Sequence, residues 1–138
     1  GSTGPVSGFT ANTIILGNGS IETLCCAQQS ISALSDKRDK TDIETLNIGD
    51  GVNFIKHLNP VNFTWNMRTG EKVGVKDQGF IAQDLSEAQK LTKFNIPGLV
   101  VENGDYMLAS YSKLLPVVVQ AIKDLKTELD EIKQLLKS

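Results

Sequence analysis

The sequence predicts an α+β protein with a small mixed core, a long C-terminal helix that self-associates into a bundle, and a short β-rich segment ahead of the core. Three observations predict this class. The first 34 residues carry almost no charge and are rich in turn-forming residues. Short strand-like and helix-like stretches alternate through the middle of the chain, and a heptad repeat occupies its end.

The composition of the 138 residues limits the possible functions. Apolar residues make up 40% and charged residues 22%, so a buried core is possible. The net charge of -2 argues against binding to nucleic acid, which needs a basic surface. No apolar run approaches the roughly 20 residues of a membrane helix, and no secretory signal is expected.

The few metal-binding and redox side chains predict neither a metal site nor a cofactor. Cys25 and Cys26 are adjacent, and with His57 they would lack both a fourth zinc ligand and the usual spacing. We therefore expect two ordinary buried or half-buried cysteines in a protein made in a reducing cytoplasm. His57 is expected to be a capping or surface residue.

The first 34 residues contain one clear turn signal. Asn18-Gly19 favours a tight turn between two candidate strands, Thr13–Leu16 and Ile21–Cys25. This stretch is too short and too polar to bury a core, so its strands would need pairing partners, which other copies of the chain could supply.

The middle of the chain begins abruptly at Ser35. Six of the eight side chains from Ser35 to Asp42 are charged. Apolar residues at helical spacing then predict a helix from Val52 that Pro60 ends. A strand over Val61–Trp65, with Phe63 and Trp65 in the core, a turn at 70–72 and a second strand over 73–81 follow. A helix from Ala82 to about Lys90 and a hairpin around Asn103-Gly104-Asp105 complete this part.

The last helix gives the clearest pattern. We expect Ser112 to cap it and Pro116 to be tolerated in its first turn. Glu128 and Lys133 fall where they could pair between parallel helices. The pattern leaves two alternatives, a helix lying on its own domain or a parallel bundle of chains, and its narrow stripe favours the bundle. The stripe has 3–4 spacing and consists of Leu115, Val118, Ile122, Leu125, Leu129, Ile132 and Leu136.

Four blocks of sequence, spread over residues 35–137, resemble the endosialidase-type intramolecular chaperone family. The chain's Ser35-Asp36-Lys37-Arg38-Asp39-Lys40 is similar to the family's opening motif, and its Gly79–Leu85 is similar to the central Gly-Phe-Ile-Ala-Gln block. Asn59-Pro60-Val61-x-Phe63-x-Trp65 fits the segment between them. The closing helix is similar at Tyr111, at Leu114–Pro116 and at 121–125.

This resemblance implies a fold and a function. Residues 35–138 would be a chaperone whose C-terminal helix, about 111–137, forms a trimeric coiled coil, and residues 1–34 would be the end of a β-rich trimeric fibre or tip. The chaperone would help a phage tail fibre or tailspike to fold in the cytoplasm of the bacterial host. It would then release itself by autoproteolysis, leaving the mature fibre on the virion tail to bind a host-cell surface receptor.

The resemblance also assigns the candidate catalytic residues, with Ser35 as nucleophile and Lys40 as base. A serine hydroxyl is a weak nucleophile until a base takes its proton, and a neutral lysine can serve. A spacing of five separates two side chains by about 140° on a helix and places them on opposite faces of a strand. The pair therefore meets only through a bend or between two subunits.

The resemblance implies that the bond that breaks lies beside Ser35, within Leu34-Ser35-Asp36. Attack on the Leu34 carbonyl passes through a five-membered ring, whereas cleavage of Ser35–Asp36 needs a water molecule or the serine of another subunit. Asp39 stands where the family usually has an apolar residue, and it favours the charged form of Lys40. Asp39 therefore leaves open a first alternative function, in which the chain is a trimerisation module that does not cut. In a second alternative, the chain is a receptor-binding fibre tip. Without the resemblance, Ser35 would be interpreted as a helix cap or turn residue.

Overall fold

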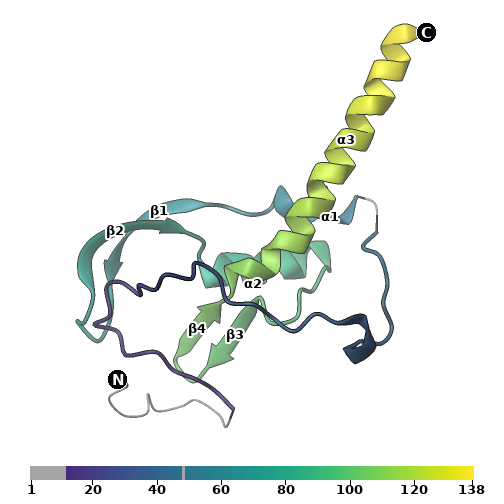
Figure 1. The fold of residues 1–138 in the computed structure, drawn as a ribbon. Helices are drawn as coiled ribbons and strands as arrows, with labels where there is room; N and C mark the ends of the chain where they lie inside the picture. Colours follow the sequence, from purple (N-terminus) through teal and green to yellow (C-terminus); the bar gives the residue numbers. More distant parts are fainter. Residues whose placement is uncertain (1–11, 48) are drawn as a thin grey trace. The chain divides into compact units, whose positions relative to one another are not determined.

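The computed structural model describes residues 12–47 and 49–138, and these divide into two compact units. One unit comprises the chain up to Thr45 together with Asn66–Val73, and the other comprises Leu46–Trp65 and Gly74–Ser138. The expected division between residues 34 and 35 stays a prediction. The helices and strands confirm a mixed α+β architecture (Figure 1): η1 Lys37–Asp39, α1 Asp50–Ile55, β1 Val61–Asn66, β2 Val73–Gly79, α2 Ala82–Thr92, β3 Val100–Asn103, β4 Tyr106–Ala109, η2 Tyr111–Leu114 and α3 Leu115–Lys137.

The strands form two sheets of two strands each, β1 with β2 and β3 with β4. In β1 the half-buried side chains of Val61, Phe63 and Trp65 alternate with exposed ones, as the sequence pattern predicts. Phe63 and Trp65 were expected in the core, but they are only half-buried and are not among the residues of the core cluster. Strands β3 and β4 pair antiparallel, from Val100 opposite Ala109 to Asn103 opposite Tyr106. The predicted hairpin is thus confirmed, and Gly104 supplies the positive φ of 58° that its turn requires.

The core lies where α1, α2 and the start of α3 meet. Its fully buried side chains include Phe54, Leu85 and Leu99, and the rings of Phe54 and Phe94 lie 5.6 Å apart. Helix α1 can approach α3 closely because Gly51 has no side chain: a Cβ there would lie 2.8 Å from the Cα of Ala121. Glycine at this position therefore sets the spacing between the two helices.

Helix α3 carries two different stripes. The stripe that packs on the core consists of Leu114, just before α3 begins, and Val117, Gln120, Ala121 and Asp124, all of them buried. All seven residues of the heptad stripe are exposed instead, from Val118 at 37% to Leu136 at 81%. Residues 125–138 are all exposed, and this part of α3 extends away from the core of its unit (Figure 1). The heptad stripe is therefore not what holds α3 on its own domain.

The entry to the last helix differs from the expected one. Ser112 lies inside the 3-10 turn η2, which runs directly into α3, so the expectation that it caps the helix is wrong. The turn follows Ser110, whose side chain makes no capping hydrogen bond. Pro116 falls in the first turn of α3, as expected, where its missing N–H leaves no helical bond unmade.

The segment before Ser35 forms its turn but not its strands. The Asn18 carbonyl accepts the backbone N–H of Ile21 at 3.2 Å, and the Asn18 side chain accepts that of Ser20 at 2.9 Å. Thr13–Leu16 and Ile21–Cys25, expected as strands, have no strand structure. Among the described residues, none pairs with these two stretches as a neighbouring strand, and short strands need such a partner.

The cysteines also differ from expectation. Both Cys25 and Cys26 are exposed free thiols rather than buried ones, and no residue in 12–47 is buried. Among the described residues, no helix combines the length and apolar content that crossing a bilayer requires.

Candidate active site

The candidate active site is built on the short turn η1. The Asp36 carbonyl accepts the N–H of Asp39 at 3.2 Å, and the Lys37 carbonyl accepts that of Lys40 at 3.1 Å. Lys40 then returns to extended backbone, with φ -130° and ψ 150°. The turn reverses the chain between Ser35 and Lys40, so that the two residues flank it on either side.

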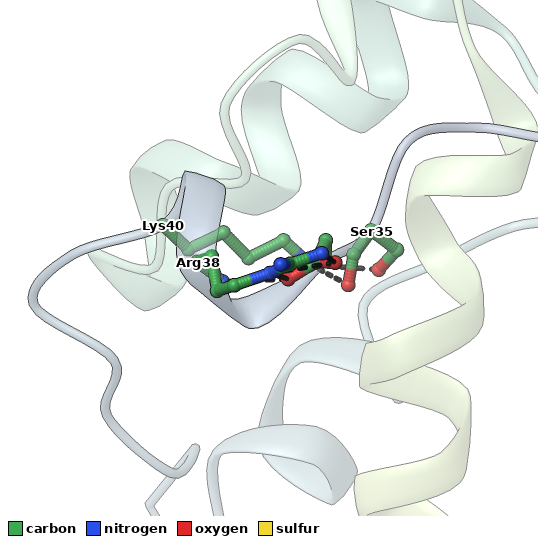
Figure 2. Close-up of polar contacts among 4 residues, drawn as sticks. Ser35, Arg38 and Lys40 are labelled. Carbon is green, nitrogen blue, oxygen red and sulfur yellow. Dashed lines mark hydrogen bonds and ion pairs between the residues drawn. The ribbon is translucent and has the colours of Figure 1, made fainter.

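This turn brings the two candidate catalytic side chains together. The Lys40 Nζ donates to Ser35 Oγ at 2.7 Å and also lies 3.3 Å from the Ser35 carbonyl oxygen. Figure 2 shows the Lys40 side chain reaching back across the turn to Ser35. The spacing of five allows the two side chains to meet either through a bend in one chain or between two subunits. In this structure they meet through a bend in one chain.

The turn is held by Asp36 and Arg38. The Asp36 Oδ1 accepts the backbone N–H of Arg38 at 2.8 Å, which makes Asp36 the N-cap of η1. The Arg38 guanidinium donates to the same carboxylate from Nε at 3.1 Å and from Nη2 at 2.8 Å. Hydrogen bonds from the Arg38 side chain and then its backbone hold the pKa of Asp36 below its usual value, and the carboxylate raises the pKa of Arg38 in return.

The surroundings of the site are open to solvent. Residues 34–40 are all exposed, Leu34 at 96%, so both bonds beside Ser35 are accessible. In the described part of the chain, the side chains of Lys37 and Asp39 make no hydrogen bond or ion pair. His57 is exposed and follows α1, and the described residues contain no group of three His, Cys, Asp or Glu side chains suited to a metal ion.

Sequence reasoning named Asp36 and Arg38 as members of the opening motif but missed that they bond to each other. The signal was present, since an Asp two residues before an Arg at a turn can both cap the backbone and accept the guanidinium. The residues expected to form the trimer seam lie elsewhere, on the exposed face of α3.

The described residues thus include an exposed Ser35–Lys40 pair and, on α3, an exposed apolar stripe. Residues 35–98 match the family described as the chaperone of endosialidase, Peptidase_S74, and this part of the chain is a domain of that family. The match begins at Ser35 and ends before β3, so it does not include α3. The family implies an intramolecular chaperone and self-cleaving serine peptidase that acts on its own phage fibre chain. No curated protein matches the chain.

Proposed function

We propose that this chain is an intramolecular chaperone that trimerises, helps the phage tail fibre or tailspike ahead of it to fold, and then releases itself by autoproteolysis at Ser35. Ser35 is the nucleophile and Lys40 the base. One observation carries the assignment of these residues: Lys40 Nζ lies 2.7 Å from Ser35 Oγ, at the first residue of the family match. This distance is within the range that proton transfer requires.

The cut begins with a proton transfer. The neutral amine of Lys40 takes the proton of the Ser35 hydroxyl, and the oxygen attacks the Leu34 carbonyl through a five-membered ring. The Leu34–Ser35 amide bond breaks as an ester forms and the Ser35 amine takes up a proton. Water then hydrolyses the ester, giving a carboxylate on Leu34 and restoring the serine hydroxyl.

A different contact of Lys40 favours cleavage of a second bond, the one between Ser35 and Asp36. Lys40 Nζ lies 3.3 Å from the Ser35 carbonyl oxygen, which belongs to the Ser35–Asp36 bond. A protonated Lys40 would polarise that carbonyl toward attack by water or by the serine of another subunit. The masses of the products distinguish the two bonds.

Assembly is assigned to the heptad stripe of α3. An exposed apolar stripe over three heptads needs a partner, and the core of the same chain does not cover it. Three copies packed in parallel would bury the stripe and place Glu128 opposite Lys133 of a neighbouring chain. The client is the fibre segment of the same chain, including residues 1–34, and the mature fibre would carry the host-cell receptor site.

Wild-type protein and the Ser35→Ala, Lys40→Ala and Lys37→Gln variants should be compared by gel, intact mass and N-terminal sequencing. Wild type and Lys37→Gln should give two fragments, of 34 and 104 residues for cleavage at Leu34–Ser35. The other two variants should stay whole. If wild type stays whole after long incubation, the peptidase assignment is wrong. The second candidate function, a trimerisation module that does not cut, would then replace it, and Asp39 is the residue that favours this candidate.

A further inference from the structure

We propose that Asp36 and Arg38 are positioning residues for cleavage: together they form a clamp that holds the turn in which Lys40 meets Ser35. This inference rests on the proposed function, since it concerns the same reaction. The clamp is the set of hydrogen bonds that join the Asp36 carboxylate to the backbone and guanidinium of Arg38.

The Asp36 carboxylate makes two kinds of contact at once. Its Oδ1 accepts the Arg38 N–H and thereby starts the 3-10 turn, while its two oxygens accept the forked guanidinium, with Nη2 2.8 Å from Oδ2. The side chain of Arg38 is thus fixed to the residue at the beginning of the same turn. Charge-assisted, forked bonds of this kind restrict the turn more than an ordinary surface pair does.

The clamp is covalently next to both reacting groups. Asp36 follows Ser35 directly, and Arg38 stands two residues before Lys40. Figure 2 shows the side chains of Arg38 and Lys40 on the turn that leads back to Ser35. Any change in the path of residues 36–38 therefore changes the distance between Ser35 Oγ and Lys40 Nζ.

In the described part of the chain, little else supports this turn. Turn η1 has three residues, none of them buried, and a 3-10 turn of this length has little stability of its own. An exposed ion pair by itself contributes little. Here, however, the same carboxylate also caps the backbone, so the two contacts restrict one short loop together. Because a displacement of about 1 Å can slow a reaction about 100-fold, a small change in this loop is enough to affect cutting.

The clamp has a second consequence for Lys40. Asp36 is the acid beside Ser35, and its oxygens are occupied by Arg38. Without Arg38, this carboxylate would be free to bind the Lys40 ammonium instead, which would draw Lys40 away from Ser35.

The test compares cleavage rates in the full chain, at matched concentration of assembled protein. Asp36→Ala and Arg38→Gln should cut at least about tenfold more slowly than wild type. Asp36→Asn keeps the oxygen that caps the turn and Arg38→Lys keeps the charge, so each should restore part of the rate. Asp39→Asn and Lys37→Gln remove the same charges from the same turn without touching the clamp, and neither should slow cutting. The oligomer mass and circular dichroism of all six variants should match wild type.

The outcomes separate this inference from the function on which it rests. If Ser35→Ala still cuts, the proposed chemistry is wrong. If Ser35→Ala stays whole while Asp36→Ala and Arg38→Gln cut at the wild-type rate, the clamp alone is rejected. A measurement independent of cutting uses the Ser35→Ala protein, in which the Arg38 Nε–H should exchange slowly with solvent and lose this protection on Asp36→Ala. Equal exchange in both proteins would overturn the clamp.

Discussion

The carboxylate of Asp124 on α3 accepts the backbone N–H of Val52 on α1 at 3.4 Å, although 72 residues separate them in the sequence. The Gln120 side chain donates to the other oxygen of the same carboxylate at 2.8 Å. Asp124 is only 3% exposed. A buried acid on α3 therefore binds the start of α1 and joins the two helices by polar contacts as well as by packing.

The Asp124 contact predicts a stability that depends on pH. Burial alone raises the pKa of Asp124, but hydrogen bonds from Gln120 and from the first turn of α1 outweigh it, so the pKa lies below its usual 3.8. The contribution of the carboxylate is thus fully present above the unfolded value and is lost as pH falls through the folded one. Asp124→Asn should lower the midpoint of thermal unfolding by several degrees at pH 7, and this difference from wild type should shrink below about pH 4.

Asp130→Asn is the matched control for this experiment. Asp130 lies on the same helix and pairs with Lys126 at 2.8 Å, but both side chains are exposed. An exposed pair contributes little, so this variant should unfold close to wild type at every pH. A difference between Asp124→Asn and wild type that stays constant down to pH 2 would contradict the assigned role of the carboxylate.

The contact between α1 and α3 predicts that Gly51→Ala destabilises the protein. Alanine is a better helix former by about 1 kcal/mol, but a Cβ here would press on the backbone of Ala121, which cannot rotate away. Overpacking of this kind costs about 1–3 kcal/mol, so the net change should be a loss of stability measurable by urea unfolding. Asn53→Ala, on the exposed side of α1, should cause no loss.

The Tyr111 hydroxyl predicts an interaction that a double-mutant cycle can measure. It accepts the N–H of Phe80 at 3.0 Å and donates to the carbonyl of Phe80 at 2.8 Å. Tyr111→Phe keeps the edge-to-face contact of the two rings and should cost about 1 kcal/mol. Gly79→Ala places a Cβ 2.7 Å from this hydroxyl, so it should cost less in the Tyr111→Phe background than in wild type. Equal costs in both backgrounds would show that the hydroxyl does not restrict residue 79.

The exposed stripe of α3 predicts that assembly can be removed without unfolding the chain. Ile122 and Leu129 are 61% and 47% exposed, so Ile122→Asp or Leu129→Asp leaves the core intact while placing a charge in the seam between chains. Sedimentation equilibrium should show monomers whose near-UV circular dichroism resembles that of wild type. Cutting should also be lost, because in the proposed function the chains assemble before they cut.

Thr127→Asp tests whether any added charge on α3 has this effect. Thr127 lies outside the heptad stripe, so this variant should assemble and cut like wild type. A monomeric Ile122→Asp protein that still cuts normally would show that the Ser35–Lys40 pair, which already meets within one chain, needs no other copy. A trimeric Leu129→Asp protein would reject the stripe as the seam.

The sequence was sufficient to predict most of the elements. Alternation predicted β1, the Asn-Gly-Asp turn predicted the β3–β4 hairpin, and 3–4 spacing predicted the last helix. The prediction that Ser112 caps the last helix failed because the 3-10 turn η2 extends the helical structure toward the N-terminus. Ser112 therefore lies inside the helical structure rather than at its start. The burial of the cysteines was predicted wrongly because residue type alone favours burial, whereas these two lie in a stretch, residues 12–47, in which no residue is buried.

The pairing within the site and on α3 was less predictable. The motif identified Ser35 and Lys40, but the spacing of five did not decide between a bend and a second subunit. That decision depends on the Asp36–Arg38 bonds, which no hydrophobic pattern records. The stripe that packs α3 on its core was equally hidden, because two of its members, Gln120 and Asp124, are polar.

The two stripes of α3 have a practical consequence for engineering. Because residues 125–138 add nothing to the core, a foreign trimeric zipper spliced in phase at Leu125 should leave the domain intact and exchange its partners. A splice shifted by one residue would rotate the grafted helix by about 100° and turn its apolar stripe away from the other chains. Under the proposed assembly, the partners of α3 are thus free to change while the core of its unit stays the same.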